Sequence, residues 1–205
     1  IGAGRSALDE WEAKQLLSAY GIPVPAGHRV LSAAAAAAAA EQLGGKLVLK
    51  AVGPQVQHKT EGGLVVLGVQ GPEAAAATHR LLVERAAGAL DAVLVEKMVD
   101  GNREFMVGIN RDPLFGPVVA FGLGGIFTEA LADVALAIAP LHDDEEASGL
   151  PDLIQAARLL GPFRGYPAVD RAALAAVIQG IARIALEHPE IAEIDVNPLL
   201  IEGDR

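Results

Sequence analysis

Cysteine is absent from the 205-residue sequence, and positively charged residues are few. Without cysteine there can be no disulfide bond, no thiolate metal site and no cysteine nucleophile. Lysine and arginine together number 16 against 26 aspartates and glutamates, which gives a net charge of −10. A broad nucleic-acid-binding surface needs clustered positive charge and is therefore not expected, although a few cations could hold one nucleotide in a cleft.

Long hydrophobic runs are also absent. Hydrophobic residues make up 52% of the chain, but no run approaches the ~18–20 apolar residues that a membrane-spanning helix needs. The first residues, IGAGRSALDE, contain no apolar signal core. We therefore expect a cytoplasmic protein with no membrane partner.

Two common nucleotide-binding signatures are missing as well. The segment FGLGGIF holds Gly122, Gly124 and Gly125, but its G-x-G-G spacing lacks the last glycine of the dinucleotide fingerprint. No stretch fits the phosphate loop G-x-x-x-x-G-K-[ST]. The glycines could still let backbone N–H groups gather around an anion. If a nucleotide binds, neither a Rossmann fold nor a P-loop fold holds it.

Helical and strand patterns alternate along the chain. Residues 1–21 are interpreted as a leading helix that Ser6 can cap and Gly21 ends. Further helices are expected over 32–43, 72–88, 152–160 and 170–187, and strands over 28–31, 46–52, 64–69, 91–99, 102–110, 116–121 and 191–202. This mixture predicts an α/β or α+β fold in which helices cover the sheets, with a lobe boundary near the turn-prone Asp-Gly at residue 100.

Lys50 lies inside the expected strand KLVLKAV, with apolar residues on both sides. A lysine in a buried strand is costly unless a negative charge meets it. Alternatively, the side chain extends outward from the strand end and reaches solvent. A functional cation and a solvated lysine both remain open on this evidence.

The segment IAEIDVNPLL carries Glu193, Asp195 and Asn197 at every second position. Alternate residues of a strand point to the same face, so three oxygen-bearing side chains share one surface. Mg²⁺ prefers such hard oxygen ligands. The alternative is an acidic strand that simply faces solvent, but the Asn-Pro that follows the carboxylates favours the metal.

Two further acids flank the expected lobe boundary. Glu96 ends one strand and Glu104 begins the next. Their carboxylates could accept hydrogen bonds from an adenine amine and from ribose hydroxyls, or could pair with Lys97 and Arg103. His58 lies on the loop GPQVQHKTEGG between two expected strands, where it is either a reactive group or part of a polar turn.

The segments EAKQLLSAYGIPVP, LVLKAVGPQVQHKTEGGLVVLGV, RDPLFGPVVAFGLGGIFTE and IAEIDVNPLL occur in this order. Together they resemble the ATP-grasp domain of NDP-forming acyl-CoA synthetases, which include ADP-forming acetate–CoA ligases and relatives of succinyl-CoA synthetase. The resemblance covers nearly the whole chain. It implies an α+β ATP-grasp fold, with an N-terminal lobe over about 22–97, a C-terminal lobe over about 98–205, and mostly antiparallel sheets covered by helices.

The resemblance also implies a nucleotide site for ATP or ADP. Lys50 would contact the phosphates, Glu96 and the backbone through Met98 would contact adenine, and Glu104 would face ribose or phosphates. Gly124 and Gly125 are candidates for a phosphate loop. Asp195 and Asn197 would hold Mg²⁺.

The implied reaction interconverts acyl-CoA, ADP and phosphate with carboxylic acid, CoA and ATP. His58 would carry the phosphoryl group as a covalent nucleophile. A CoA-binding alpha-type subunit or fused domain would be the partner, so a hetero-oligomer or a multidomain chain is expected.

Ala137 departs from the arginine expected at its position in many relatives. A second interpretation is therefore kept: a non-catalytic, ligand-sensing ATP-grasp-like domain of a larger protein such as a protein acetyltransferase.

Overall fold

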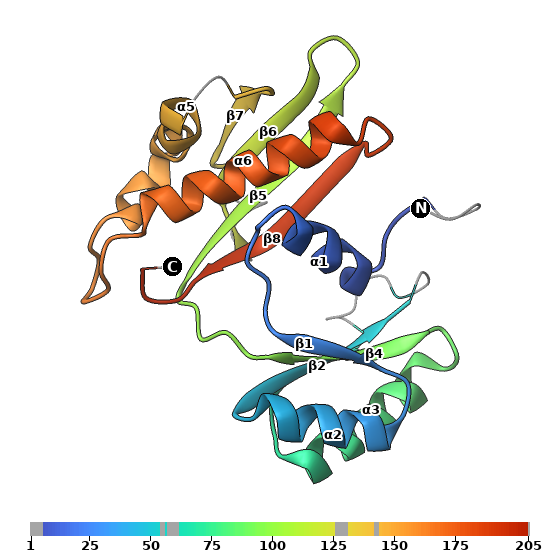
Figure 1. Ribbon diagram of the computed structural model, residues 1–205. Coiled ribbons are helices and arrows are strands. Elements are labelled where there is room, and N and C mark those ends of the chain that lie inside the picture. The colour runs from blue at the N-terminus through green and yellow to red at the C-terminus, as the bar shows by residue number, and fades with distance from the viewer. Residues whose placement is uncertain (1–5, 54–55, 57–61, 126–130, 142–143, 205) are drawn as a thin grey trace. The chain divides into compact units, whose positions relative to one another are not determined.

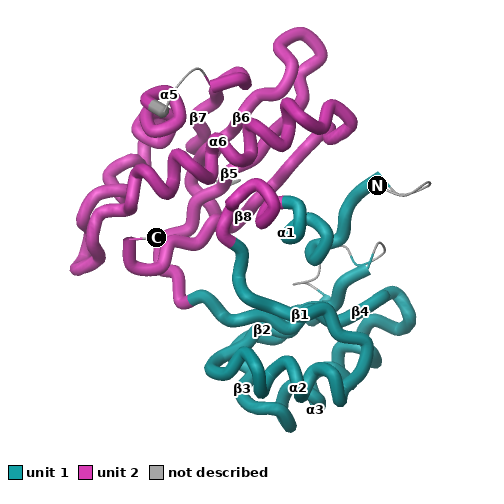
Figure 2. The backbone as a smooth tube through the Cα atoms, in the orientation of Figure 1, with its two compact units in different colours: residues 1–16, 24–99 teal, residues 17–23, 100–205 magenta. Residues whose placement is uncertain are grey.

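The computed structural model describes residues 6–53, 56, 62–125, 131–141 and 144–204. The chain forms two compact units (Figure 2), of which unit 1 comprises residues 1–16 and 24–99, and unit 2 comprises residues 17–23 and 100–205. Each unit contains one four-stranded sheet. Within the described ranges, no helix is both long and apolar enough to cross a membrane.

Unit 1 is built on a sheet with the strand order β1-β4-β2-β3. Its strands are β1 Gly27–Val30, β2 Lys46–Val52, β3 Val65–Gln70 and β4 Ala92–Lys97, and the helices α2 Ala33–Leu43 and α3 Pro72–Ala86 cover one face (Figure 1). Leu47 and Leu49 of β2 join the core on the face that α2 and α3 cover. Lys50 and Val52 point to the opposite face, where Trp11 packs against a small cluster of Val52, Ala92 and Leu94.

The helix α1 Glu10–Ala19 begins later than the sequence pattern predicts. Asp9 and Glu12 form a reciprocal capping box: each side chain accepts a hydrogen bond from the other residue's backbone N–H, at 2.9 and 3.0 Å. The expectation that Ser6 caps this helix is therefore wrong. Residues 17–23, which include the end of α1, belong to unit 2.

Unit 2 is built on a sheet with the strand order β7-β6-β5-β8. Its strands are β5 Arg103–Asp112, β6 Gly116–Leu123, β7 Val134–Ile138 and β8 Glu193–Ile201, and the helix α6 Arg171–Glu187 runs across one face (Figure 1). Phe105 of β5 and Phe121 of β6 are fully buried, and their rings stack with centroids 5.4 Å apart. The alternation along β5 sends Met106, Gly108 and Asn110 to the other face.

Short helices connect β7 to α6. They are α5 Asp144–Gly149 and two 3₁₀ helices, η2 Leu150–Leu153 and η3 Gln155–Leu160. The single helix expected over 152–160 is thus two 3₁₀ segments that meet at Ile154, which has extended backbone angles. Buried Asp133 accepts hydrogen bonds from the backbone N–H groups of Gln155 and Ala156, which anchors the start of η3.

Every pairing in the two sheets is antiparallel. The expected α+β class, with antiparallel sheets and helices over their faces, is confirmed. Each sheet has one face covered by helices. Lys50 and Glu96 lie on the opposite face of the unit 1 sheet, and Asp195 and Asn197 lie on the opposite face of the unit 2 sheet.

Candidate nucleotide and metal site

Lys50 and Glu96 come together on the face of the unit 1 sheet that α2 and α3 do not cover. Lys50 lies on β2 and Glu96 on the neighbouring strand β4, and the Lys50 Nζ is 3.1 Å from a Glu96 carboxylate oxygen. Only 3% of the Glu96 side chain is exposed, against 23% for Lys50. A carboxylate buried to this extent needs a cation, and among the described residues Glu96 forms ion pairs with Lys50 and Lys14.

Helix α1 supplies the other two charges, which sequence reasoning missed. The Lys14 Nζ lies 2.5 and 2.6 Å from the two Glu96 oxygens, and 2.9 Å from Glu10. Glu10 also accepts a hydrogen bond from Lys50 at 2.6 Å. The signal available in the sequence was the i, i+4 spacing of Glu10 and Lys14 on a helix that precedes the strands.

We call Glu10, Lys14, Lys50 and Glu96 the unit 1 charge cluster. Burial by itself lowers the pKa of Lys50, but the charges and hydrogen bonds of Glu10 and Glu96 outweigh it, so the net pKa is raised. Lys50 is therefore a firmly charged lysine. The strand β1 makes room for Glu96 because Gly27 pairs with it, and a Cβ at Gly27 would lie 2.7 Å from the Glu96 Cγ.

The backbone at Met98 is already engaged within unit 1. Its N–H donates to the carbonyl oxygen of Lys46 at 2.9 Å, which continues the pairing of β4 with β2. The contact between the Met98 backbone and adenine therefore stays a prediction. The same holds for adenine recognition by Glu96, whose carboxylate binds two lysines here.

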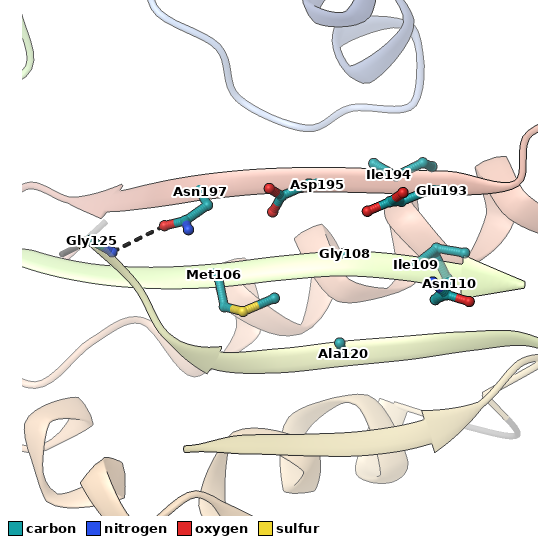
Figure 3. A pocket seen from close by; sticks show the side chains of 10 residues that line it. All are labelled: Met106, Gly108, Ile109, Asn110, Ala120, Gly125, Glu193, Ile194, Asp195 and Asn197. Carbon is teal, nitrogen blue, oxygen red and sulfur yellow. Dashed lines mark hydrogen bonds between the residues drawn. The ribbon is translucent and has the colours of Figure 1, made fainter. Parts of the chain in front are cut away.

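Unit 2 contains a cavity of about 600 Å³ on the face of its sheet opposite α6. Ten residues of β5, β6, β8 and the glycine turn after β6 line it (Figure 3): Met106, Gly108, Ile109, Asn110, Ala120, Gly125, Glu193, Ile194, Asp195 and Asn197. A cavity of this size suits a small-molecule ligand. The polar groups of the wall are concentrated on β8.

The three polar residues predicted on β8 do share one face. Figure 3 shows Glu193, Asp195 and Asn197 in a row along the strand, beside Asn110 and Gly108 of β5. Desolvation in the cavity wall, and then the negative charge of Glu193, raise the pKa of Asp195. Two carboxylates that repel each other favour an added cation, although no group of three His, Asp or Glu side chains in the described ranges could hold a metal alone.

Asn197 ties the glycine turn to β8. Its Oδ1 accepts a hydrogen bond from the Gly125 N–H at 3.0 Å, and the Gly124 N–H donates to the Glu104 carbonyl at 2.9 Å. Both N–H groups of the candidate phosphate loop thus have acceptors within unit 2. Phosphate binding there would require these bonds to be exchanged and stays a prediction.

Glu104 lies on β5 next to the same turn. A Cβ at Gly125, whose φ is +70°, would collide with the Glu104 carboxylate. Glycine is therefore required at this position by both backbone angle and space. His58, the predicted phosphoryl carrier, lies outside the described residues.

Comparisons with known proteins agree with this architecture. The family model of the ATP-grasp domain matches residues 1–205. The chain is 39% identical to the beta subunit of an ADP-forming acetate–CoA ligase I from Pyrococcus furiosus, over 96% of this chain and 87% of that subunit. It is 38% identical to an ADP-forming acetate–CoA ligase I from Archaeoglobus fulgidus, over 93% of this chain but only 28% of that longer protein.

The fold is shared with solved structures of the dinucleotide-forming acetyl-coenzyme A synthetase 1 from Ca. Korarchaeum cryptofilum. Its complex with coenzyme A, Ca-AMPCP and HgCl+ has a TM-score of 0.91 and 37% identity, covering 96% of this chain and 88% of that one. A second complex holds coenzyme A and Mg-AMPPCP, with a phosphohistidine segment pointing towards the nucleotide binding site. It has a TM-score of 0.85 and 36% identity, covering 96% of this chain and 87% of that one.

The resemblance found in the sequence is therefore confirmed, together with the ATP-grasp fold that it implied. The regulatory alternative is not favoured, because the relatives at this level of similarity are ligases. The chain belongs to the ATP-grasp domain family and is the beta-subunit-like portion of an ADP-forming acid–CoA ligase.

Proposed function

We propose that this chain is the nucleotide-binding half of an ADP-forming acyl-CoA synthetase. It transfers a phosphoryl group between ATP or ADP and a histidine, while the complete enzyme interconverts acyl-CoA, ADP and phosphate with carboxylic acid, CoA and ATP. The relatives named above are ligases of this type. The single observation that carries the proposal is the cavity of unit 2, whose wall holds the side-chain oxygens of Asp195 and Asn197.

Lys50 is the proposed phosphate cation. Its position on a central strand fixes the backbone, and its raised pKa keeps the ammonium charged throughout the neutral range. Phosphoryl transfer depends mostly on positioning and charge neutralisation, which an ammonium on a rigid strand supplies. Glu96 and the backbone at Met98 are the proposed contacts of adenine, and Glu104 is the proposed contact of ribose or phosphates.

Asp195 and Asn197 are the proposed protein ligands of Mg²⁺. The residues fit this ion: Asp195 offers a carboxylate at the cavity wall, and the Asn197 Oδ1 keeps a second lone pair beside its bond to Gly125. Mg²⁺ commonly takes one or two protein ligands and completes its shell with phosphate oxygens and water. When bound, it would neutralise charge on the nucleotide phosphates. A solved relative was obtained with Mg-AMPPCP.

His58 is the proposed carrier. A neutral imidazole, with an ordinary pKa near ~6.5, is available as a nucleophile at neutral pH. In the ATP-consuming direction one ring nitrogen attacks the γ-phosphorus, an N–P bond forms, and the P–O bond to ADP breaks with the electron pair leaving on ADP. The Korarchaeum enzyme has a phosphohistidine segment that points towards its nucleotide binding site, which supports a phosphohistidine step in the proposed reaction.

A CoA-binding partner is part of the proposal. The chain spans 87% of the Pyrococcus beta subunit but only 28% of the Archaeoglobus ligase. We propose that an alpha-type subunit or fused domain supplies the CoA site and the acid specificity, so the carboxylic acid is selected outside this chain.

Radiolabelled phosphoryl transfer tests the proposal. The chain is incubated with Mg²⁺ and ATP labelled at the γ-phosphate, and acid-labile protein-bound label is measured for the wild type, for His58→Ala and for His28→Ala as the control. Label in the wild type and in His28→Ala, but not in His58→Ala, is expected. Persistent label in His58→Ala would assign the carrier to another residue.

A further inference from the structure

The proposed phosphate cation already has two anionic partners. Lys50 contacts Glu10 at 2.6 Å and Glu96 at 3.1 Å, and Lys14 contacts the same two carboxylates. Two ammonium groups and two carboxylates add to no net charge. A nucleotide phosphate that approaches Lys50 therefore meets a neutral cluster rather than a free cation.

The two carboxylates are not held equally. Both oxygens of Glu96 lie within 2.6 Å of Lys14, and its side chain is 3% exposed on a central strand. Glu10 is 23% exposed and lies in the first turn of α1. Removing the Lys50 contact costs less at Glu10, because a more exposed carboxylate regains hydration.

Lys14 makes such an exchange possible. It reaches Glu10 at 2.9 Å as well as Glu96, so both carboxylates keep a cation after Lys50 turns away. A buried carboxylate left without any cation would be strongly destabilising, and the position of Lys14 avoids that state.

We infer that Glu10 is a counter-ion that nucleotide phosphate displaces from Lys50, and that Lys14 holds Glu10 and Glu96 while the exchange takes place. This inference rests on the proposed nucleotide-binding function. Glu10 and Lys14 are positioning residues, because they act on the nucleotide through Lys50. In the absence of nucleotide, Glu10 keeps Lys50 charged and holds its side chain in place. Phosphate must therefore bind Lys50 more favourably than Glu10 does.

Calorimetric titration with two ligands tests the exchange. ATP and inorganic tripolyphosphate are each titrated into the wild type, Glu10→Gln and Glu41→Gln, where Glu41 is an exposed control on α2. Glutamine keeps the size of Glu10 but loses its charge. Both ligands are expected to bind Glu10→Gln about tenfold more tightly, within the range usual for coupled binding, because tripolyphosphate carries the phosphates without adenine or ribose. Glu41→Gln should match the wild type.

A double-mutant cycle with Lys14→Gln compares the change in ligand affinity caused by Glu10→Gln with and without Lys14. A purely structural role of Lys14 would leave that change the same. Lys14 and Lys50 both contact Glu10, so the loss of Lys14 leaves more of the Glu10 charge to Lys50, and Glu10→Gln should increase affinity more in the Lys14→Gln background than alone. Equal increases in ligand affinity in the two backgrounds would show that Lys14 takes no part in the exchange. Thermal unfolding of each variant shows whether it is folded.

The outcomes separate the inference from the function on which it rests. If the wild type binds ATP and Glu10→Gln binds it equally or more weakly, the exchange is wrong while the nucleotide site stands. If neither protein binds ATP or tripolyphosphate, the proposed nucleotide site itself is overturned. Tighter binding of both ligands by Glu10→Gln supports the exchange.

Discussion

The charged groups of the two units are arranged in opposite ways. In unit 1, Lys50 and Glu96 belong to a neutral cluster in which every charge has an opposite partner. In unit 2, Glu193 and Asp195 line a cavity, and within the described residues neither forms an ion pair. The difference teaches that an anion at the unit 1 charge cluster has to exchange with a carboxylate, whereas an added cation would relieve the repulsion between Glu193 and Asp195 in unit 2.

The largest effect is expected where removal of one charge disrupts the neutral cluster. Glu96→Gln leaves Lys14 and Lys50 with the single charge of Glu10, so the free energy of unfolding should fall by about 3 kcal/mol. Urea denaturation measures it. The exposed control Glu41→Gln should change stability by less than about 0.5 kcal/mol. If Glu96→Gln lowers the free energy of unfolding no more than this control does, the cluster contributes little to stability.

Removal of one carboxylate charge in unit 2 should leave the fold intact and weaken the dependence of ATP affinity on Mg²⁺. Asp195→Asn relieves repulsion with Glu193, so the variant should be as stable as the wild type or slightly more stable. The gain in ATP affinity that Mg²⁺ brings should fall by about tenfold or more. Titrations with and without Mg²⁺ measure it. An unchanged Mg²⁺ dependence would favour the alternative interpretation, in which β8 is an acidic strand that simply faces solvent.

A smaller effect is expected at the glycine turn. Gly125→Ala forces alanine to a φ of +70° beside the Glu104 carboxylate, and Gly116→Ala forces it to +77° in open space. Each should cost about 1 kcal/mol of stability from backbone conformation. Only Gly125→Ala should also weaken Mg²⁺–ATP binding, because the bond to Asn197 is disturbed. Equal ATP affinity in the two variants would show that the glycine turn does not contribute to nucleotide binding.

The smallest effect concerns alkaline pH. The pKa of Lys50 is raised above 10.5 in the folded state, because Glu10 and Glu96 outweigh the opposing effect of burial. The stability gained from the charged form is therefore complete below the unfolded pKa and is lost as pH rises through the folded pKa.

The comparison of wild type with Lys50→Met isolates this contribution. The difference in unfolding free energy should stay constant from about pH 7 to about pH 10 and shrink above that range. A difference that already shrinks well below the ordinary lysine pKa would show that burial, rather than the two carboxylates, controls Lys50.

The sequence predicted the sheets better than the helix ends. A short run of apolar residues identifies the strand Lys46–Val52, and the alternation of polar and apolar residues identifies the start of Glu193–Ile201. The start of α1 was misplaced, because Ser6 and Asp9 are both good caps and only the local geometry selects Asp9. The 3₁₀ pair Leu150–Leu153 and Gln155–Leu160 follows from the extended backbone at Ile154, which no residue pattern signals.

The site was predictable within one strand and not across elements. The spacing of Glu193, Asp195 and Asn197 fixed their common face, because that face depends on one strand alone. The need of Lys50 for a negative partner followed from burial, but the choice of Glu10 and Glu96 depends on the position of α1 and on the pairing of β4 with β2. Such long-range packing leaves no signature in a single segment.

Calorimetric titration of ATP with and without Mg²⁺, into the wild type and Lys50→Ala, tests the central claim most directly. The nucleotide-binding account predicts binding that Mg²⁺ strengthens, and a loss of at least about tenfold in affinity in Lys50→Ala. Undetectable ATP binding by the wild type, or equal affinity in Lys50→Ala, would contradict it.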